Sequence, residues 1–208
     1  GAIQVAFFVD ATGSMCDEMD FLKTDLEEII SRAEAFDANV FIETAALVYR
    51  DIDDDYVTRN SDFTKTFSDT KAFIAQQESA GGGDWPEAVH TALEVGLENM
   101  NWDLNARSRI VFLILDAPCH SEQPVLQSVR QSITKYAEKG IHIIPVSASG
   151  IDKSTEFLLR YFALATDGTY VFITNDSGIC DEHLEPTVGE YEVELLRDLI
   201  YRLIVERI

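Results

Sequence analysis

Three oxygen-bearing side chains stand at alternate positions near the start of the chain. Asp10, Thr12 and Ser14 supply one carboxylate and two hydroxyl groups, and a looped backbone can aim all three oxygens at one point. Oxygen ligands without a nitrogen or sulfur donor suit Mg²⁺, Ca²⁺ or Mn²⁺ better than zinc or copper. The spacing therefore predicts a site for a hard divalent cation.

Two later segments carry acids in comparable settings. Asp116 follows the strand-like stretch 109–115, apolar from residue 110 onward, which repeats the order of the opening: a buried strand, then Asp-Ala, then a polar loop. Between these two segments, the glycine run 81–83 leads to Asp84 and Glu87. Taken alone, the Gly-rich loop fits a flexible linker with a helix cap as well as it fits a binding loop. The second strand that ends in Asp favours the binding loop.

The apolar stretch before Asp10 positions that carboxylate. Residues 5–9 are five apolar residues in a row, which predicts a strand buried on both faces. Residues 17–36 carry apolar side chains at a helical period, so a long amphipathic helix is expected to begin just beyond Ser14. Parallel strands of an open α/β sheet end at one edge, where ligands bind, so Asp10 and Asp116 are expected side by side.

Strands and helices alternate through most of the chain. This predicts an α/β fold with three layers, in which a doubly wound, mostly parallel six-stranded sheet has one antiparallel edge strand and helices on both faces. A length of 208 residues fits one domain over 1–208. The expected strands are 5–9, 40–49, 109–115, 141–146 and 169–173, with a return strand in short pieces at 56–58 and 63–67. The expected helices are 17–36, 70–79, 88–99, 124–139, 154–165 and 191–208, and Ser68 or Asp69 is expected to cap the second of them.

Other polar groups have simpler interpretations. The acidic turn 50–55 lacks the Gly and the distal Glu of an EF-hand loop, so we interpret it as a solvated hairpin tip. His142 lies in an apolar strand, which is typical of a core or face residue rather than a metal ligand. The irregular loop 175–189 contains Cys, Asp, Glu and His without a recognised metal-binding spacing.

The charge balance excludes some partners. With 16 Lys and Arg against 37 Asp and Glu, the formal net charge is −21, which repels nucleic acid and anionic membrane surfaces. We therefore expect no nucleic acid binding. No apolar run is long enough to span a bilayer, and no signal-peptide pattern opens the chain, so we expect no membrane insertion either.

The three cysteines are too few for a disulfide scaffold and have no C-x-x-C spacing, and they leave the compartment open. Cys16 follows the first loop and Cys119 follows Asp116, so the two thiols are expected to lie near each other if their strands are neighbours. A disulfide beside the site and two independently packed thiols are both compatible with this spacing.

Taken together, these segments resemble the von Willebrand factor A domain, the fold of integrin I-type domains. In that family a metal-ion-dependent adhesion site combines an Asp-x-Ser/Thr-x-Ser loop after the first strand, a Thr or acid in a later Gly-rich loop, and an Asp that ends the fourth strand. Asp10, Thr12 and Ser14 match the first element, and Asp116 matches the last.

The middle element departs from the commoner Gly-Gly-Thr form of the family. The stretch 83–87, Gly-Asp-Trp-Pro-Glu, is similar to the Asp-x-Pro-Glu loop of integrin β subunits, where the Glu reaches the metal. By that comparison Glu87 is the ligand, whereas its place directly after the glycine run makes Asp84 the alternative. The motifs also resemble a subgroup of A domains that includes those attached to atypical α-kinases.

The resemblance implies a binding module rather than an enzyme. Its metal, Mg²⁺ or else Ca²⁺ or Mn²⁺, would keep one open position that accepts the Asp or Glu carboxylate of a protein partner. The implied ligand set is Asp10, Thr12, Ser14, Asp84, Glu87 and Asp116.

Two rival hypotheses remain at the level of sequence. The stretch 10–14 also resembles the Asp-Lys-Thr-Gly-Thr loop of P-type pumps and haloacid dehalogenase folds, in which the Asp is a nucleophile toward phosphate. That family needs a later Lys and a Gly-Asp-x-x-x-Asp loop, and neither stands at a convincing place here. The other rival is an A domain that binds no metal and serves as a scaffold.

Overall fold

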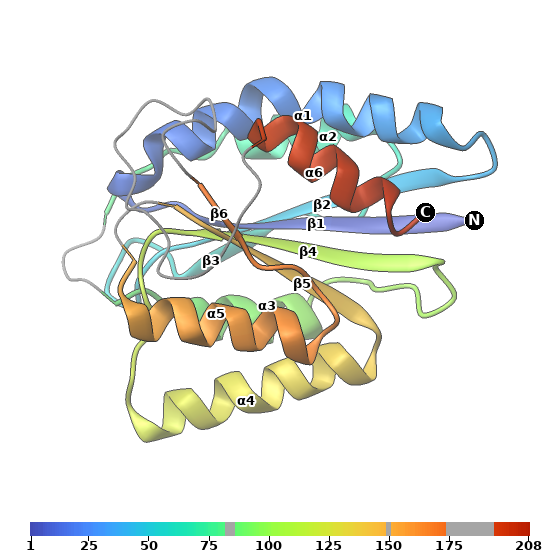
Figure 1. The fold of residues 1–208 in the computed structure, drawn as a ribbon. Coiled ribbons are helices and arrows are strands. Elements are labelled where there is room, and N and C mark those ends of the chain that lie inside the picture. Colours follow the sequence, from blue (N-terminus) through green and yellow to red (C-terminus); the bar gives the residue numbers. More distant parts are fainter. Residues whose placement is uncertain (82–85, 149–150, 174–193) are drawn as a thin grey trace.

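The centre of the molecule is a six-stranded sheet with the strand order β3-β2-β1-β4-β5-β6 (Figure 1). The computed structural model describes residues 1–81, 86–148, 151–173 and 194–208, with the backbone alone for residues 16–18. Strand β3 runs antiparallel to β2, and the other neighbouring strands are parallel. The strands are β1 (Ala2–Asp10), β2 (Phe41–Tyr49), β3 (Thr58–Asn60), β4 (Ser108–Leu115), β5 (Ile141–Ser147) and β6 (Val171–Phe172).

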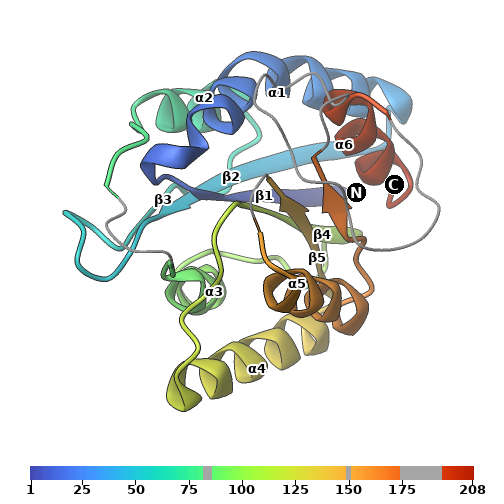
Figure 2. The same cartoon turned by 60° about the vertical axis from the view of Figure 1, so that its left-hand side comes forward.

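Helices cover both faces of this sheet. Figures 1 and 2 show α1, α2 and α6 over one face and α3, α4 and α5 over the other. Each layer closes its own hydrophobic core against the sheet. The helices are α1 (Cys16–Phe36), α2 (Phe67–Ala75), α3 (Val89–Glu98), α4 (Gln123–Glu138), α5 (Lys153–Ala165) and α6 (Leu196–Val205), with the short 3-10 helix η1 (Gly13–Met15) before α1.

Strand β1 is apolar over residues 5–9 because both of its faces are buried. Phe7 and its alternate neighbours face the core under α1 and α6, whereas Phe8 faces the core under α3 and α4. Phe7 stacks on Phe112 of β4, with the ring centroids 5.6 Å apart. This packing fixes the end of β1, and therefore Asp10, relative to β4.

The predicted fold class is confirmed, including the antiparallel edge strand β3. The return strand differs in detail, since it spans 58–60 and continues only as a bridge between Thr64 and Thr44. Helix α2 begins at Phe67, three residues earlier than predicted, and the caps expected at Ser68 or Asp69 are wrong. The Asp69 carboxylate instead accepts a hydrogen bond from the Thr64 hydroxyl.

Helix α6 spans 196–205, which is shorter than the predicted 191–208. Residues 191–193 and the predicted loop 175–189 lie outside the described part.

His142 is half-buried in β5, and its Nδ1 lies 2.9 Å from the carbonyl oxygen of Thr166, as expected for a face residue. Over the part of the chain that the structure describes, no helix combines the length and apolarity that a bilayer crossing requires.

Candidate metal site

Two acids stand at the carboxyl ends of neighbouring parallel strands. Asp10 is the last residue of β1, and Asp116 directly follows β4. The two strands pair in register, with Val9 opposite Ile114. From β1 the chain continues to β2 on one side, while β4 lies on the other side, so this edge is a switch point of the sheet. Ligands of open α/β sheets bind in the crevice at such points.

The loop after β1 folds back on the Asp10 carboxylate. Asp10 Oδ1 accepts hydrogen bonds from the backbone N–H of Thr12 at 2.9 Å and from its hydroxyl at 2.7 Å. The hydroxyl oxygens of Thr12 and Ser14 lie 3.4 Å apart. Asp10 and Thr12 are buried, whereas Ser14 is exposed at the start of η1. The three oxygens therefore converge, as their alternate spacing predicts.

A third carboxylate, that of Glu87, reaches this edge beside that of Asp116. Glu87 is 3% exposed, and its backbone N–H donates to the carbonyl of Pro118 at 2.9 Å, which places Glu87 beside the end of β4. Asp116 is 9% exposed. Burial raises the pKa of Asp116, while a hydrogen bond from the Ser14 hydroxyl opposes that effect.

The electrostatics of this edge favour a cation. Burial, together with the negative charges of Asp10, Asp51 and other nearby acids, raises the pKa of Glu87 to about 8. Glu87 Oε2 and Asp116 Oδ1 are buried, and within the described part of the chain neither accepts a hydrogen bond. Buried carboxylate oxygens without donors are suitable ligands for a hard cation.

The ligand assignments nevertheless stay predictions. Across residues 1–81, 86–148, 151–173 and 194–208, no three His, Cys, Asp or Glu side chains converge closely enough to hold a metal ion. Two of the predicted ligands, Thr12 and Ser14, are hydroxyls rather than members of these residue types, and Asp84 lies outside the described residues. The structure thus brings Asp10 together with the two hydroxyls and leaves the choice between Asp84 and Glu87 open.

Sequence reasoning missed a buried arginine that braces the loop. Arg50 is 7% exposed, and its guanidinium donates to the carbonyl of Ala11 at 3.2 Å and to that of Glu78 at 2.7 Å. It also stacks on the Tyr56 ring at 4.5 Å. Arg50 therefore ties the loop after β1 to the chain that leads into the glycine run. An Arg directly after an apolar strand was the available signal, but its carbonyl partners are remote in sequence.

The acidic turn after β2 is the tip of the β2–β3 hairpin, as predicted, but it is not entirely solvated. Asp53 and Asp55 are exposed, but Asp51 is buried and its Oδ1 lies 2.6 Å from His120 Nε2. This pair joins the turn after β2 to the loop after β4, on the rim of the candidate site. Burial of Asp51 is possible because His120 supplies a polar partner.

Cys119 is a free, buried thiol in the apolar core under α3 and α4, and burial raises its pKa to about 11. Of the two alternatives for the cysteines, the structure therefore has Cys119 as a packed thiol and not in a disulfide with Cys16. The side chain of Cys16 lies outside the described residues.

Replacing Arg50 with Met is expected to loosen the loop that carries the candidate ligands. The change leaves the carbonyls of Ala11 and Glu78 without their charged donor, and we expect the free energy of unfolding to fall by about 2–4 kcal/mol. Denaturant unfolding measures this loss. Arg59→Met is the matched control, since Arg59 also stacks on Tyr56 but is exposed. Equal losses in both variants would contradict the bracing role.

Comparison with known proteins adds independent findings. The family model described as von Willebrand factor A domain matches residues 4–178. An ariadne-like RING finger protein of Acanthamoeba polyphaga mimivirus is 33% identical over 118 residues, and the alpha-protein kinase vwkA of Dictyostelium discoideum is 30% identical over 125 residues. These alignments cover 57% and 58% of this chain, but 11% and 19% of the two relatives.

A solved structure shares the fold. The proximal thread matrix protein 1 of the mussel byssus superimposes with a TM-score of 0.58 at 15% sequence identity. The match covers 83% of this chain and 41% of that one. At this level of identity the likeness speaks for the fold alone.

Proposed function

The chain belongs to the von Willebrand factor A domain family, and from this premise we propose that it is a protein-interaction module whose binding depends on a divalent cation at the carboxyl edge of the sheet. The observation that carries the proposal is the convergence of Asp10, Thr12 and Ser14 beside two buried carboxylates, those of Glu87 and Asp116.

The residues at this edge fit a hard cation. The hydroxyls of Thr12 and Ser14 and the carboxylates of Asp10 and Asp116 would hold it, directly or through water, together with Glu87 or Asp84. When bound, the cation supplies an incompletely neutralised positive charge that attracts an outside carboxylate. The chain's own contribution is to position the donors, because Asp10 is anchored by Thr12 and the loop is braced by Arg50.

The partner would present an Asp or Glu carboxylate. A surface with a formal net charge of −21 repels acidic proteins in general. A partner carboxylate must therefore come with basic neighbours that offset this repulsion, which makes the acidity a filter for specificity.

Burial of Asp10 supports binding over phosphoryl transfer. An aspartate nucleophile must meet the phosphorus of its substrate, but Asp10 is 0% exposed and its Oδ1 already accepts two hydrogen bonds from Thr12. We therefore propose that the chain is not an enzyme of the aspartyl-phosphate type, and that Asp10 acts on a cation instead.

Peptides that present a single carboxylate test this function. We expect peptides with one Glu flanked by Lys or Arg to bind in the presence of Mg²⁺ or Mn²⁺. The open metal position binds the Glu carboxylate, and the acidic surface attracts the Lys or Arg side chains. Chelation, or replacement of the peptide Glu with Gln, is expected to weaken binding at least tenfold in fluorescence polarisation. Binding that is equal with and without chelator would refute the cation dependence, and equal binding of Glu and Gln peptides would refute the carboxylate.

A further inference from the structure

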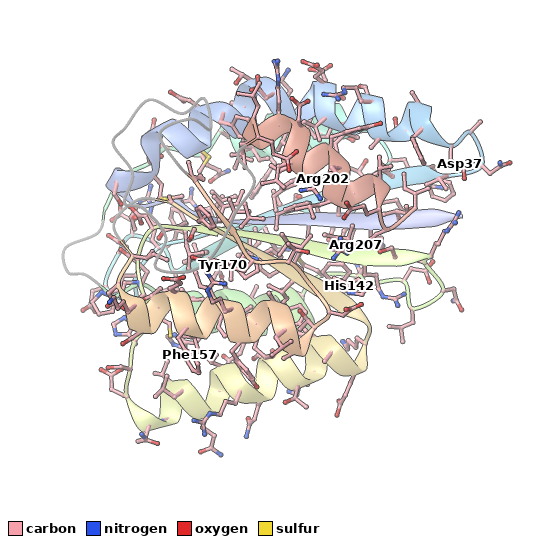
Figure 3. The ribbon with its side chains drawn as sticks, in the orientation of Figure 1. Asp37, His142, Phe157, Tyr170, Arg202 and Arg207 are labelled. Carbon is pink, nitrogen blue, oxygen red and sulfur yellow. The ribbon has the colours of Figure 1, made fainter. Side chains whose placement is uncertain are left out.

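A second polar site lies at the opposite edge of the sheet. A cavity of about 450 Å³ opens where β4 and β5 begin, and its lining includes Ser108 and His142 from these strands and Arg207 from the segment after α6. Figure 3 shows His142 and Arg207 together at this end of the molecule. Its volume falls in the range of small-molecule sites. The cation site at the carboxyl edge uses none of these residues.

The strands provide two polar groups to this cavity. Ser108 is 6% exposed, and its hydroxyl has no hydrogen-bond partner in the described part of the chain. His142 Nδ1 lies 2.9 Å from the carbonyl of Thr166 and 3.1 Å from that of Asp167, so Nδ1 carries a proton and donates it. Nε2 is then the remaining polar atom of the ring. Buried hydroxyls need partners, and a ligand in the cavity can supply one.

Two guanidinium groups line the same cavity with incomplete charge compensation. Arg207 donates to the carbonyls of Leu203 at 3.1 Å and Asp167 at 3.4 Å, and it forms no ion pair with any residue that the structure describes. Arg107 is 3.7 Å from the Asp37 carboxylate, a long contact between partly exposed groups. Both guanidinium groups therefore retain the capacity to bind an anion.

Two acids also line the cavity and offset part of these charges. Glu206 is paired with Arg202 at 2.9 Å, but Arg202 also pairs with Glu194, so the charge of Glu206 is only partly compensated. Asp167 is exposed, and its backbone carbonyl rather than its carboxylate makes the recorded contacts with His142 and Arg207. In a chain with a net charge of −21, this edge is thus a place where a small anion meets two guanidinium groups.

The wall of the cavity is a rigid turn. Asp167 has a φ of 54°, in the left-handed region, and a Cβ on Gly168 would lie 1.8 Å from the carbonyl oxygen of Ile143. Because the two backbone segments approach so closely, no side chain fits at position 168. This turn is therefore in place before any ligand arrives, so a ligand does not have to order this part of the wall.

We propose that this cavity binds a small molecule bearing a phosphate-like oxyanion. The guanidinium groups of Arg107 and Arg207 pair with its charged oxygens, and the Ser108 hydroxyl donates to another oxygen. His142 Nε2 accepts a hydrogen bond from the protonated oxygen of a hydrogen phosphate group. Both free phosphate and a phosphate monoester have this chemistry.

Binding of inorganic phosphate and of phenyl phosphate tests the proposal. Isothermal titration calorimetry is run with chelator present, so that no divalent cation takes part, and with sodium chloride at matched ionic strength as the reference. We expect saturable binding by the wild-type chain and at least a tenfold loss of affinity in Arg207→Gln and in Arg107→Gln. Tighter binding of phenyl phosphate identifies a monoester ligand, and equal binding identifies free phosphate.

Matched variants separate the site from general charge effects. Arg197→Gln removes the same charge from an exposed position on α6 and is expected to bind as the wild type does. Arg107→Gln keeps the test decisive if Arg207→Gln fails to fold, because Arg107 is half exposed and its ion pair with Asp37, the residue after α1, is long at 3.7 Å. Absence of saturable binding, or equal weakening by Arg197→Gln and Arg107→Gln, would overturn the proposal.

Discussion

Asp10→Asn is expected to abolish stabilisation of the chain by Mg²⁺, Ca²⁺ or Mn²⁺. The amide oxygen of Asn can still accept the hydrogen bonds that Asp10 Oδ1 receives from Thr12, so the loop after β1 keeps its anchor. The substitution removes the negative charge that a cation needs at the centre of its ligand set. The loss therefore falls on cation binding rather than on the fold.

The effect is large enough for thermal unfolding. A ligand at 100 times its dissociation constant stabilises the native state by about 2.7 kcal/mol. For a chain of 208 residues, this corresponds to a rise in Tm of about 5–10 °C. We expect this rise in the wild-type chain and none in Asp10→Asn.

The metal-free variant and a charge control complete the test. Without cation, Asp10→Asn is expected to be at least as stable as the wild type, because it relieves repulsion with Glu87. Asp62→Asn removes the same charge from an exposed position and is expected to keep the full cation-dependent rise. A rise that persists unchanged in Asp10→Asn would refute the assignment of Asp10 as a ligand.

The fold could be predicted because its determinants are local patterns. The apolar run of β1 and the apolar period of α1 are legible over a few residues, and alternation of such elements leaves few topologies. Helix α2 was misplaced because a capping preference at Ser68 or Asp69 is weak. The start at Phe67 follows from tertiary contacts, since this side chain packs against the core under α1.

The candidate site was predictable where it is local and not where it depends on long-range pairing. The loop from Asp10 to Ser14 is compact, so its spacing shows its geometry. Arg50 reaches carbonyls 39 and 28 residues away, and Asp51 meets His120 across 69 residues. Such partners depend on which strands become neighbours, and no spacing rule contains that information. The same holds for the cavity at the amino edge, whose arginines come from segments about 100 residues apart.

The metal-free chain is expected to lose stability as pH rises from about 5 to 8, and Glu87 is the main cause. Burial and neighbouring acids raise the pKa of Glu87 to about 8 in the folded state, against 4.5 as its ordinary value. Between these values the folded chain holds a proton that the unfolded chain has released, so the free energy of unfolding falls with pH. Asp116, whose pKa is also raised by burial, acts in the same direction.

Urea unfolding in chelator at pH 5.5 and pH 8 measures this fall, which we expect to be on the order of 3 kcal/mol, since one pKa unit corresponds to about 1.4 kcal/mol. Glu87→Gln is expected to flatten the dependence and to be more stable than the wild type at pH 8. Glu98→Gln, at an exposed position at the end of α3, is expected to leave it unchanged.

Saturating cation is expected to remove this trend if Glu87 is a ligand. The cation binds the ionised carboxylate, so it displaces the proton that Glu87 holds below pH 8, and its stabilising effect grows as pH rises. The difference in stability with and without cation is therefore expected to be larger at pH 8 than at pH 5.5 in the wild type. In Glu87→Gln the increase of this difference with pH is expected to be smaller, because only the other acids of the site then contribute to it. If the stabilisation by cation increases with pH equally in the wild type and in Glu87→Gln, Asp84 is instead the ligand from the Gly-rich loop.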